Sequence, residues 1–201
     1  ELANNVTIVG RTTIGEGNRI FPFAVLGTEP QALRFNGEPT ELIIGDNNII
    51  REFVTMNIGT VKGDRVTRVG NSNMIMAYAH IPHDAEIADN VILANGVQLG
   101  GHTRIERDVT FGGLAAVHHF VKIGQKAFIG GLTRVVHDAP PVMTTEGHPA
   151  RVKCVNTIGL KRRGFTPEKI EALRESYKLL WRSNITRPTA LQLLENREPQ
   201  F

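Results

Sequence analysis

A repeat of six residues runs without interruption from Val69 to Pro140 and constrains the fold more than any other feature of the sequence. The segment divides into twelve blocks, and the first residue of every block is bulky and apolar, as at Ile81, Leu99 and Val117. The fifth residue is mostly small or β-branched, while Gly, Asn and Asp collect at the second to fourth positions. This period predicts a parallel β-helix. The fifth and first positions point inward along a short strand, and the positions between them form a corner that accepts positive φ.

Three strands and three corners close one triangular coil of eighteen residues, so the predicted fold class is an all-β solenoid. Stacked coils pair through their backbones and bury one continuous apolar column. Phe111 is the one aromatic residue in that column, which indicates a narrow interior. The spacing leaves the hand of the coil open, and the general rule for parallel crossovers favours a right-handed one.

The repeat also sets the domain boundaries. It is visible from Ile14 to Gly27, stops, returns at Ile44, and ends for good after Pro141. We therefore expect a β-helix over residues 1–141 with insertions at 28–43 and 61–68, and insertions in a solenoid often build the binding site. Residues 142–201 are expected to form an irregular linker and a small C-terminal α-helical domain. Its main helix is predicted to begin after Thr166, with Pro167 at the first helical position.

Composition excludes several classes of protein. The 201 residues carry a net charge of +3, which favours anionic partners but is far from the composition of a nucleic-acid-binding protein. No apolar run approaches the length of a membrane span, and the residues that follow Glu1 do not form the charged-then-apolar pattern expected of a signal peptide. The single Cys154 excludes an internal disulfide and favours a reducing compartment, so we expect a cytoplasmic protein.

Histidine is the residue type that points to a function. Six of the seven histidines lie in the uniform repeat, and five of them fall on one corner of the triangle. The sixth, His80, is the outward residue of the strand that enters this corner. The column of residues through His83 continues with Gly101, His119 and His137, one coil apart each time. A single exposed histidine would carry no information, but six on one edge predict a functional groove.

Two chemistries could use such an edge. Imidazoles from stacked coils hold zinc in the hexapeptide-repeat carbonic anhydrases, but the place of that family's third ligand is Gly124 here. The other chemistry is acyl transfer, with one of the histidines as general base and a corner N–H as oxyanion donor. Asp84 follows His83 directly and could orient the ring of that histidine. No Ser or Cys stands near this edge in a triad arrangement, which favours direct transfer without a covalent intermediate.

Four segments give the edge a family resemblance: 79–84 (AHIPHD), 99–102 (LGGH), 112–120 (GGLAAVHHF) and 158–165 (IGLKRRGF). Together they resemble the acyl-carrier-protein:UDP-N-acetylglucosamine O-acyltransferases of lipid A biosynthesis. The resemblance implies a left-handed parallel β-helix of hexapeptide repeats and a homotrimer whose active sites lie between neighbouring chains. It also implies UDP-GlcNAc and acidic acyl carrier protein as partners, with no metal and no cofactor.

The resemblance assigns roles to particular residues. His83 would deprotonate the glucosamine 3-hydroxyl, the Gly101 N–H would stabilise the thioester oxyanion, and Asp84 would support the base. Gly131 would stand where the length of the acyl chain is limited. The residues that would contact the substrates are Arg34, His80, His102, His118, His119, Asn156, Arg162 and Arg163, with His119 where the family usually has Gln.

Some positions depart from the family pattern. Ala32 replaces a carboxylate, Asn57 replaces a histidine just before the second insertion, and Pro149 replaces another histidine. Three alternatives therefore remain at this point. They are a CoA-dependent acetyltransferase, a zinc-dependent anhydrase, and a non-catalytic β-helix that binds a sugar nucleotide.

Overall fold

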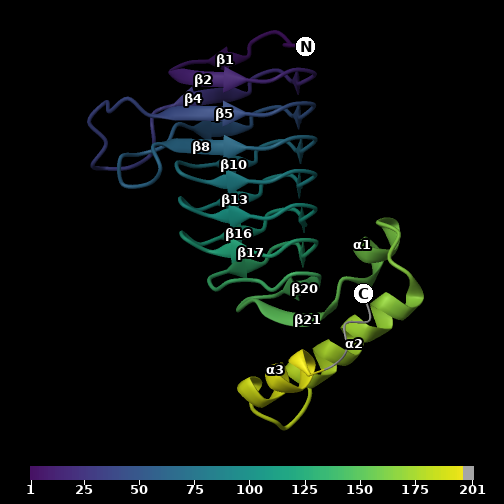
Figure 1. Cartoon of the computed structure of the whole chain (residues 1–201). Helices are drawn as coiled ribbons and strands as arrows, with labels where there is room; N and C mark the ends of the chain where they lie inside the picture. Colours follow the sequence, from purple (N-terminus) through teal and green to yellow (C-terminus); the bar gives the residue numbers. More distant parts are fainter. Residues whose placement is uncertain (197–201) are drawn as a thin grey trace.

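The computed structural model describes residues 1–196, and their most prominent feature is a column of stacked triangular coils (Figure 1). The predicted parallel β-helix is confirmed: its walls are three sheets, and every neighbouring pair of strands within the coils is parallel. The first wall consists of β1 (Thr7–Ile8), β4 (Val25–Thr28), β7 (Thr55–Asn57), β10 (His80–Ile81), β13 (Gln98–Leu99), β16 (Ala116–Val117) and β19 (Arg134–Val135).

The other two walls follow in chain order within each coil. The second consists of β2 (Arg11–Ile14), β5 (Glu41–Ile44), β8 (Val66–Val69), β11 (Glu86–Ile87), β14 (Arg104–Ile105) and β17 (Lys122–Ile123). The third consists of β3 (Arg19–Ile20), β6 (Ile49–Ile50), β9 (Met74–Ile75), β12 (Ile92–Leu93), β15 (Thr110–Phe111), β18 (Phe128–Ile129), β20 (Met143–Glu146) and β21 (Arg151–Val155).

The interior matches the periodicity of the sequence. First-position and fifth-position residues are fully buried, as Ile81 and Ala85 are, and one apolar cluster runs the length of the coils. Phe111 is the single aromatic residue among the buried members of that cluster. Because the other buried members are aliphatic side chains and Met56, the three walls stay close together around a packed core.

The sequence separation between paired strand residues shows where the two insertions lie. In the uniform region paired residues lie 18 apart, as Ile87 and Ile105 do, whereas Arg11 pairs with Glu41 and Thr55 pairs with His80. The first insertion ends before the end of the expected range 28–43, since β5 begins at Glu41. The second lies earlier than the expected range 61–68, since β7 ends at Asn57 and β8 begins at Val66. β5 and β8 are each four residues long, so their first two residues precede the six-residue pattern that marked the return of the repeat.

The corners correct one expectation about glycine. Positive φ occurs at the fourth position of the blocks, and it is adopted there by bulky residues such as Tyr78, His102 and Phe120 as well as by Asn90. Gly101, at a third position, does not have positive φ. It is required for space, because a Cβ there would lie 2.5 Å from His83 Cε1. The glycine was therefore correctly placed in a corner but for the wrong physical reason.

After the last coil, β20 continues the third wall and β21 turns back antiparallel to it. Three helices follow: α1 (Thr157–Arg162), α2 (Pro167–Trp181) and α3 (Arg187–Glu195). The Thr166 side chain caps α2 and Pro167 opens it, as predicted. Ile170 and Tyr177 of α2 pack with Met143, Val155 and Leu160 in an apolar cluster separate from the column. None of the helices within residues 1–196 is long and apolar enough to cross a membrane.

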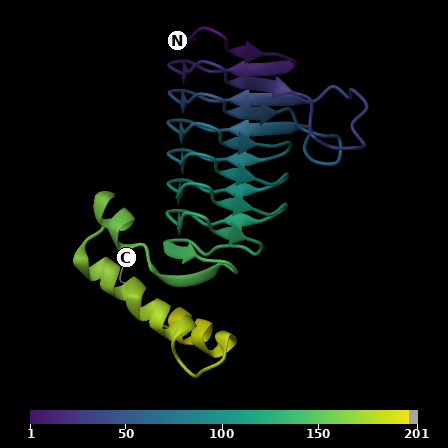
Figure 2. The same cartoon turned by 180° about the vertical axis from the view of Figure 1, so that it is seen from behind.

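Figures 1 and 2 show the first insertion as a long loop on one side of the β-helix, while α1 lies on the opposite side. This arrangement matters for the site, because predicted substrate contacts lie on both of these segments.

Candidate active site

The corner that follows the first wall carries the histidines and is called the histidine corner below; it comprises residues 82–84, 100–102, 118–120 and 136–138. The corner after the second wall, which includes residues 88–90 and 106–108, is called the ladder corner. The corner after the third wall, which includes residues 76–78 and 130–132, is called the aromatic corner. Both insertions leave the β-helix at the histidine corner, one after β4 and one after β7. The insertions therefore lie directly beside the histidines.

His83 and Asp84 form the pair that the sequence predicted. His83 Nδ1 lies 2.9 Å from Asp84 Oδ2, and both side chains are largely buried. An ionised carboxylate can only accept a hydrogen bond. In the neutral ring this contact therefore places the proton on Nδ1 and leaves a lone pair on Nε2. His83 is thereby oriented as a base.

Asp84 is held by residues that the sequence pattern did not reveal. Its carboxylate accepts hydrogen bonds from the Thr60 backbone N–H at 2.9 Å and from the Thr60 hydroxyl at 2.6 Å. Its own N–H donates to Thr67 Oγ1. Burial by itself would raise the pKa of Asp84, but the hydrogen bonds from His83 and Thr60 outweigh burial and hold the pKa below its usual value. Asp84 therefore remains an anion beside His83.

Thr60 and Thr67 were missed because they lie in and just after the second insertion, where the repeat is interrupted. Gly63 of the same insertion packs so tightly on Asp84 that a Cβ would come within 2.3 Å of Oδ1. The insertion thus covers the carboxylate and excludes water from it. In the sequence, the loss of the repeat was the one signal that could have pointed to these residues.

Gly101 lies directly against the base, as the predicted oxyanion donor should. A Cβ built on Gly101 would lie 2.8 Å from His83 Nε2, so the backbone of Gly101 and the free nitrogen of His83 adjoin the same space. The Gly101 N–H is not vacant, however: it donates to His119 Nδ1 at 2.9 Å. The sequence predicted both residues for the site but not the bond between them.

His102 and His80 flank the pair. His102 Nε2 lies 3.6 Å from Asp84 Oδ2, and its ring stacks on Phe120 with 4.5 Å between centroids. His80 Nδ1 lies 2.7 Å from the Thr55 hydroxyl. Burial lowers the pKa of both His80 and His102, and Asp84 offsets part of the effect on His102. Both rings are therefore poised as neutral hydrogen-bonding groups.

A cavity of about 190 Å³ opens beside the histidines, between the two insertions. It is lined by His83 and His102, by Ala32, Arg34 and Glu38 of the first insertion, and by Lys62 of the second. Arg34 was predicted to contact substrate, and it does lie at the site. The two cationic side chains outnumber the one carboxylate, which favours an anionic ligand such as a nucleotide sugar.

Other predicted residues lie away from this cavity. His118 is exposed further along the histidine corner, with Nδ1 3.4 Å from the His119 carbonyl oxygen. Gly131 lies on the aromatic corner, where the nearest atom to an added Cβ would be the Gly113 carbonyl oxygen at 3.3 Å. A side chain at Gly131 would therefore press on the Gly113 backbone, and Gly131 is one wall away from His83.

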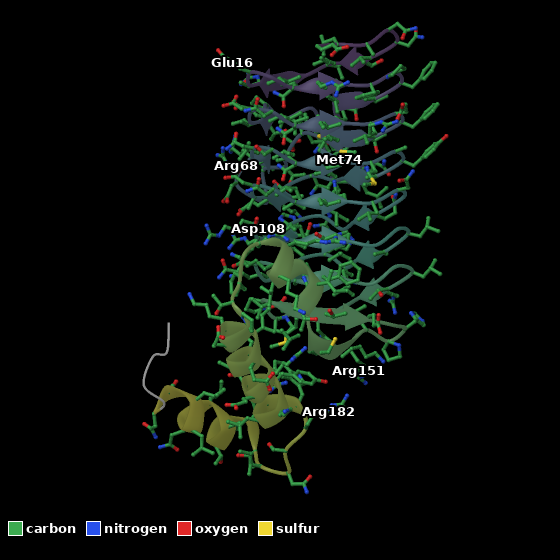
Figure 3. The ribbon with its side chains drawn as sticks, turned by 90° about the vertical axis from the view of Figure 1, so that its right-hand side faces the viewer. Glu16, Arg68, Met74, Asp108, Arg151 and Arg182 are labelled. Carbon is green, nitrogen blue, oxygen red and sulfur yellow. The ribbon has the colours of Figure 1, made fainter. Side chains whose placement is uncertain are left out.

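Asn156, Arg162 and Arg163 lie at or on α1, beside the ladder corner. The Asn156 side chain caps α1 by accepting from the Gly159 N–H and also donates to the Lys126 carbonyl. Arg163 donates to the Asp108 carbonyl at 2.9 Å and pairs with the Asp108 carboxylate, so it fastens α1 to the β-helix; Figure 3 shows Asp108 beside that helix. Arg162 is exposed. Within one chain these residues do not meet the histidines.

The ligand atoms of His83, Asp84 and His102 lie within 4.8 Å of one another, a spacing that a divalent cation could bridge. The hydrogen bonds account for the same cluster without a cation, because the Asp84 carboxylate already accepts hydrogen bonds from the His83 ring and from the N–H and hydroxyl of Thr60. The arrangement is an oriented base with a backbone N–H beside it, which is the equipment of general-base acyl transfer.

Comparison with known proteins agrees with this geometry. Residues 138–201 match the family model described as "Udp N-acetylglucosamine O-acyltransferase; Domain 2", and residues 67–101 match the bacterial transferase hexapeptide repeat. The chain is similar to a crystal structure of a UDP-N-acetylglucosamine acyltransferase, with a TM-score of 0.91, 42% identity, and coverage of 98% of this chain and 77% of the other. The enzyme from Moraxella catarrhalis gives a TM-score of 0.89 and 35% identity, with coverage of 96% and 85%. Together these matches indicate the left-handed form of the β-helix.

Sequence relatives cover nearly the whole chain. The acyl-[acyl-carrier-protein]–UDP-N-acetylglucosamine O-acyltransferase of Gloeothece citriformis is 48% identical over 95% of this chain and 69% of its own length. That of an Anaeromyxobacter species is 47% identical over 94% of this chain and 73% of its own length. The chain therefore belongs to the family of acyl-[acyl-carrier-protein]–UDP-N-acetylglucosamine O-acyltransferases.

Proposed function

We propose that the protein transfers a 3-hydroxyacyl group from acyl carrier protein to the glucosamine 3-hydroxyl of UDP-GlcNAc, the first step of lipid A biosynthesis. Family membership supports the reaction. The single structural observation that carries it is the His83–Asp84 pair packed against the Gly101 backbone. No Ser or Cys is needed, because the acceptor hydroxyl is itself the nucleophile.

The chemistry follows from the positions of three groups. His83 Nε2 takes the proton of the acceptor hydroxyl as its oxygen attacks the thioester carbonyl, and the carboxylate of Asp84 stabilises the resulting imidazolium. The carbonyl oxygen becomes an oxyanion that accepts from the Gly101 N–H. Collapse of this intermediate breaks the carbon–sulfur bond, and the proton on His83 passes to the departing thiolate. An ester and a free thiol result.

The active unit is a homotrimer in this proposal, with each site built from two chains. His83 lies on the histidine corner, Gly131 on the aromatic corner, and Arg162 beside the ladder corner. These groups belong to different corners of one column, so one substrate can reach all of them most simply if the corners of neighbouring chains come together. Arg162 and the exposed imidazole of His118 would then bind the nucleotide phosphates, while Asn156 and Arg163 would position α1.

A mixing experiment tests the two-chain site. His83→Ala and Arg162→Ala chains with different tags are co-expressed, and the hybrid assemblies are purified through both tags. Hybrids should recover activity well above either parent, since one junction unites intact His83 with intact Arg162. Recovery that never exceeds the average of the parents would show that each site lies within one chain.

The remaining expectations belong to the same proposal. Residues 142–201 would act as a C-terminal domain that docks the carrier protein; the separate apolar cluster under α2 supports such a unit, and residues 197–201 lie outside the described part. The protein would be cytoplasmic in this proposal, because carrier-bound acyl groups occur there and its reducing conditions keep a free cysteine such as Cys154 reduced. No metal or cofactor takes part, so treatment with a chelator should leave the rate unchanged.

One assay tests the reaction and its rivals. Purified protein is incubated with UDP-GlcNAc and a mixture of 3-hydroxyacyl carrier proteins, and products are analysed by mass spectrometry. The expected product is UDP-GlcNAc carrying one ester-linked 3-hydroxyacyl group. A product from acetyl-CoA instead would identify an acetyltransferase, and binding of UDP-GlcNAc with no product from any donor would identify a non-catalytic binder.

A further inference from the structure

Some corner N–H groups of this β-helix donate to a side chain of the next coil. At the ladder corner, three successive third-position N–H groups donate to the side chain of the third-position residue one coil further on. Glu16 donates to Asp46, Asp46 to Asn71, and Asn71 to Asp89, each at 2.7 Å. The coil thus presents an outward N–H at this position, and a side-chain acceptor one coil away saturates it.

The histidine corner repeats this geometry at the reacting centre. The Gly101 N–H donates to His119 Nδ1, again from a third position to the third position of the next coil. Here the acceptor is an exposed imidazole, and the donor is the N–H expected to hold the oxyanion. The ladder of bonds does not continue to the preceding coil, because Gly101 has no side chain that could accept from it. The ring of His83, which lies in the preceding coil, fills the space that a side chain at Gly101 would take.

The two roles of the Gly101 N–H conflict. An oxyanion must come within about 2.7–3.1 Å of its donor, and His119 Nδ1 already lies at 2.9 Å. The thioester oxygen cannot come within hydrogen-bonding distance of the Gly101 N–H while the His119 ring occupies that position. His119 has room to leave, because it is exposed and the one aromatic ring it contacts among the described residues is that of His118, edge-on with 5.3 Å between centroids.

We propose that His119 closes the oxyanion position of the substrate-free enzyme and that the acyl donor must displace it, so that His119 sets the affinity for the donor. The proposal rests on the acyl transfer described above. His119 acts through the Gly101 N–H and touches no reacting atom, so it is a positioning residue. Loss of one hydrogen bond of this kind corresponds to about a two- to tenfold change in an equilibrium constant.

Three variants separate this role from a structural one. His119→Ala removes the acceptor and should lower the Kd and the KM of the acyl donor about two- to tenfold, with kcat and the KM of UDP-GlcNAc within twofold of wild type. His119→Gln restores an acceptor of similar reach and should return the donor Kd to the wild-type value. Asn71→Ala, the matched change at the ladder corner, should lower Tm and leave both KM values unchanged.

Calorimetry with an acyl-phosphopantetheine measures the donor Kd without turnover. A donor Kd in His119→Ala that equals or exceeds the wild-type value overturns the proposal, as does a fall in kcat, which would mean that His119 contacts the reacting atoms. Wild-type turnover of acyl carrier protein decides the proposed function separately. A wild-type enzyme that turns over, with a donor Kd insensitive to His119, would leave the function standing and remove only this inference.

Discussion

The histidine corner and the ladder corner have the same backbone arrangement, but their side chains use the backbone N–H groups differently. Both present a third-position N–H that points toward the next coil. At the ladder corner Asp and Asn side chains saturate these donors with short bonds that only hold coils together. At the histidine corner the same positions carry His83, Gly101 and His119, so the donor stands beside a base. A β-helix therefore supplies potential oxyanion donors at regular intervals, and the side chains decide which one takes part in chemistry.

The insertions make the second difference. Both emerge at the histidine corner, and the second covers Asp84 through Thr60 and Gly63. A buried carboxylate with several donors keeps its charge and its direction, whereas Asp46 and Asp89 of the ladder corner are exposed. A carboxylate becomes useful to a base only where a loop removes it from water.

The largest expected effect separates two third-position glycines. Gly101→Ala places a methyl group on the ring of His83 and should reduce kcat/KM about 10⁴-fold, because the base is displaced and the N–H is obstructed together. Gly113→Ala is the control, since the nearest atom to its added Cβ is 3.5 Å away. Steady-state kinetics on both variants checks the difference; equal activities would refute the tight packing of His83 on Gly101.

Asp84→Asn should reduce kcat about 10²- to 10³-fold while KM changes little. The amide can donate to His83 Nδ1, which would move the ring proton to Nε2 and remove the basic lone pair. Because the pKa of Asp84 is held low in the folded protein, its stabilising contribution is present above the unfolded value near 3.9 and is lost as pH falls toward the folded value. The variant should therefore have a lower free energy of unfolding than wild type at pH 7. Its free energy of unfolding should also fall less between neutral and acidic pH. An unchanged kcat would remove Asp84 from the mechanism.

Asp89→Ala tests the ladder corner. It removes the acceptor of the Asn71 N–H and of the Asn71 side chain and should cost about 1 kcal/mol, or roughly 2–4 °C in Tm for a domain of this size. Because Asp89 is not among the residues proposed to contact a substrate, kcat/KM should stay within twofold of wild type. A large loss of activity with normal Tm would contradict the division between the two corners.

The smallest effect concerns His80. Burial lowers the pKa of His80, so the folded protein favours the neutral ring and the unfolded chain binds protons first as pH falls through about 6.5. Stability should therefore decline on acidification from pH 7.5 to 5.5. His80→Asn keeps a partner for the Thr55 hydroxyl but does not titrate, so its decline in Tm should be shallower. Parallel slopes would exclude His80 as a source of the pH dependence.

The sequence predicted the fold well because one strict period determines both the buried column and the corners. Sorting residues by corner was enough to bring together His83, Gly101 and His102. It was not enough to find Thr60 and Thr67, since the partners of Asp84 lie where the repeat is interrupted, and an interrupted pattern carries no register.

Tertiary contacts explain the other differences. Asn156 and Arg163 were predicted as ligand contacts, and the structure shows them engaged with Lys126 and Asp108, residues far away in the sequence that only folding brings near α1. The bond between Gly101 and His119 depends on which way an exposed ring turns, and no spacing rule specifies that.

The most direct test of the account is the rate of acyl transfer by His83→Ala, measured on protein whose Tm matches wild type. We expect kcat to fall about 10²- to 10⁴-fold, because the acceptor hydroxyl loses its base while the cavity and the Gly101 N–H remain. A kcat within threefold of wild type would contradict the assignment of the base and, with it, the chemical role of the histidine corner.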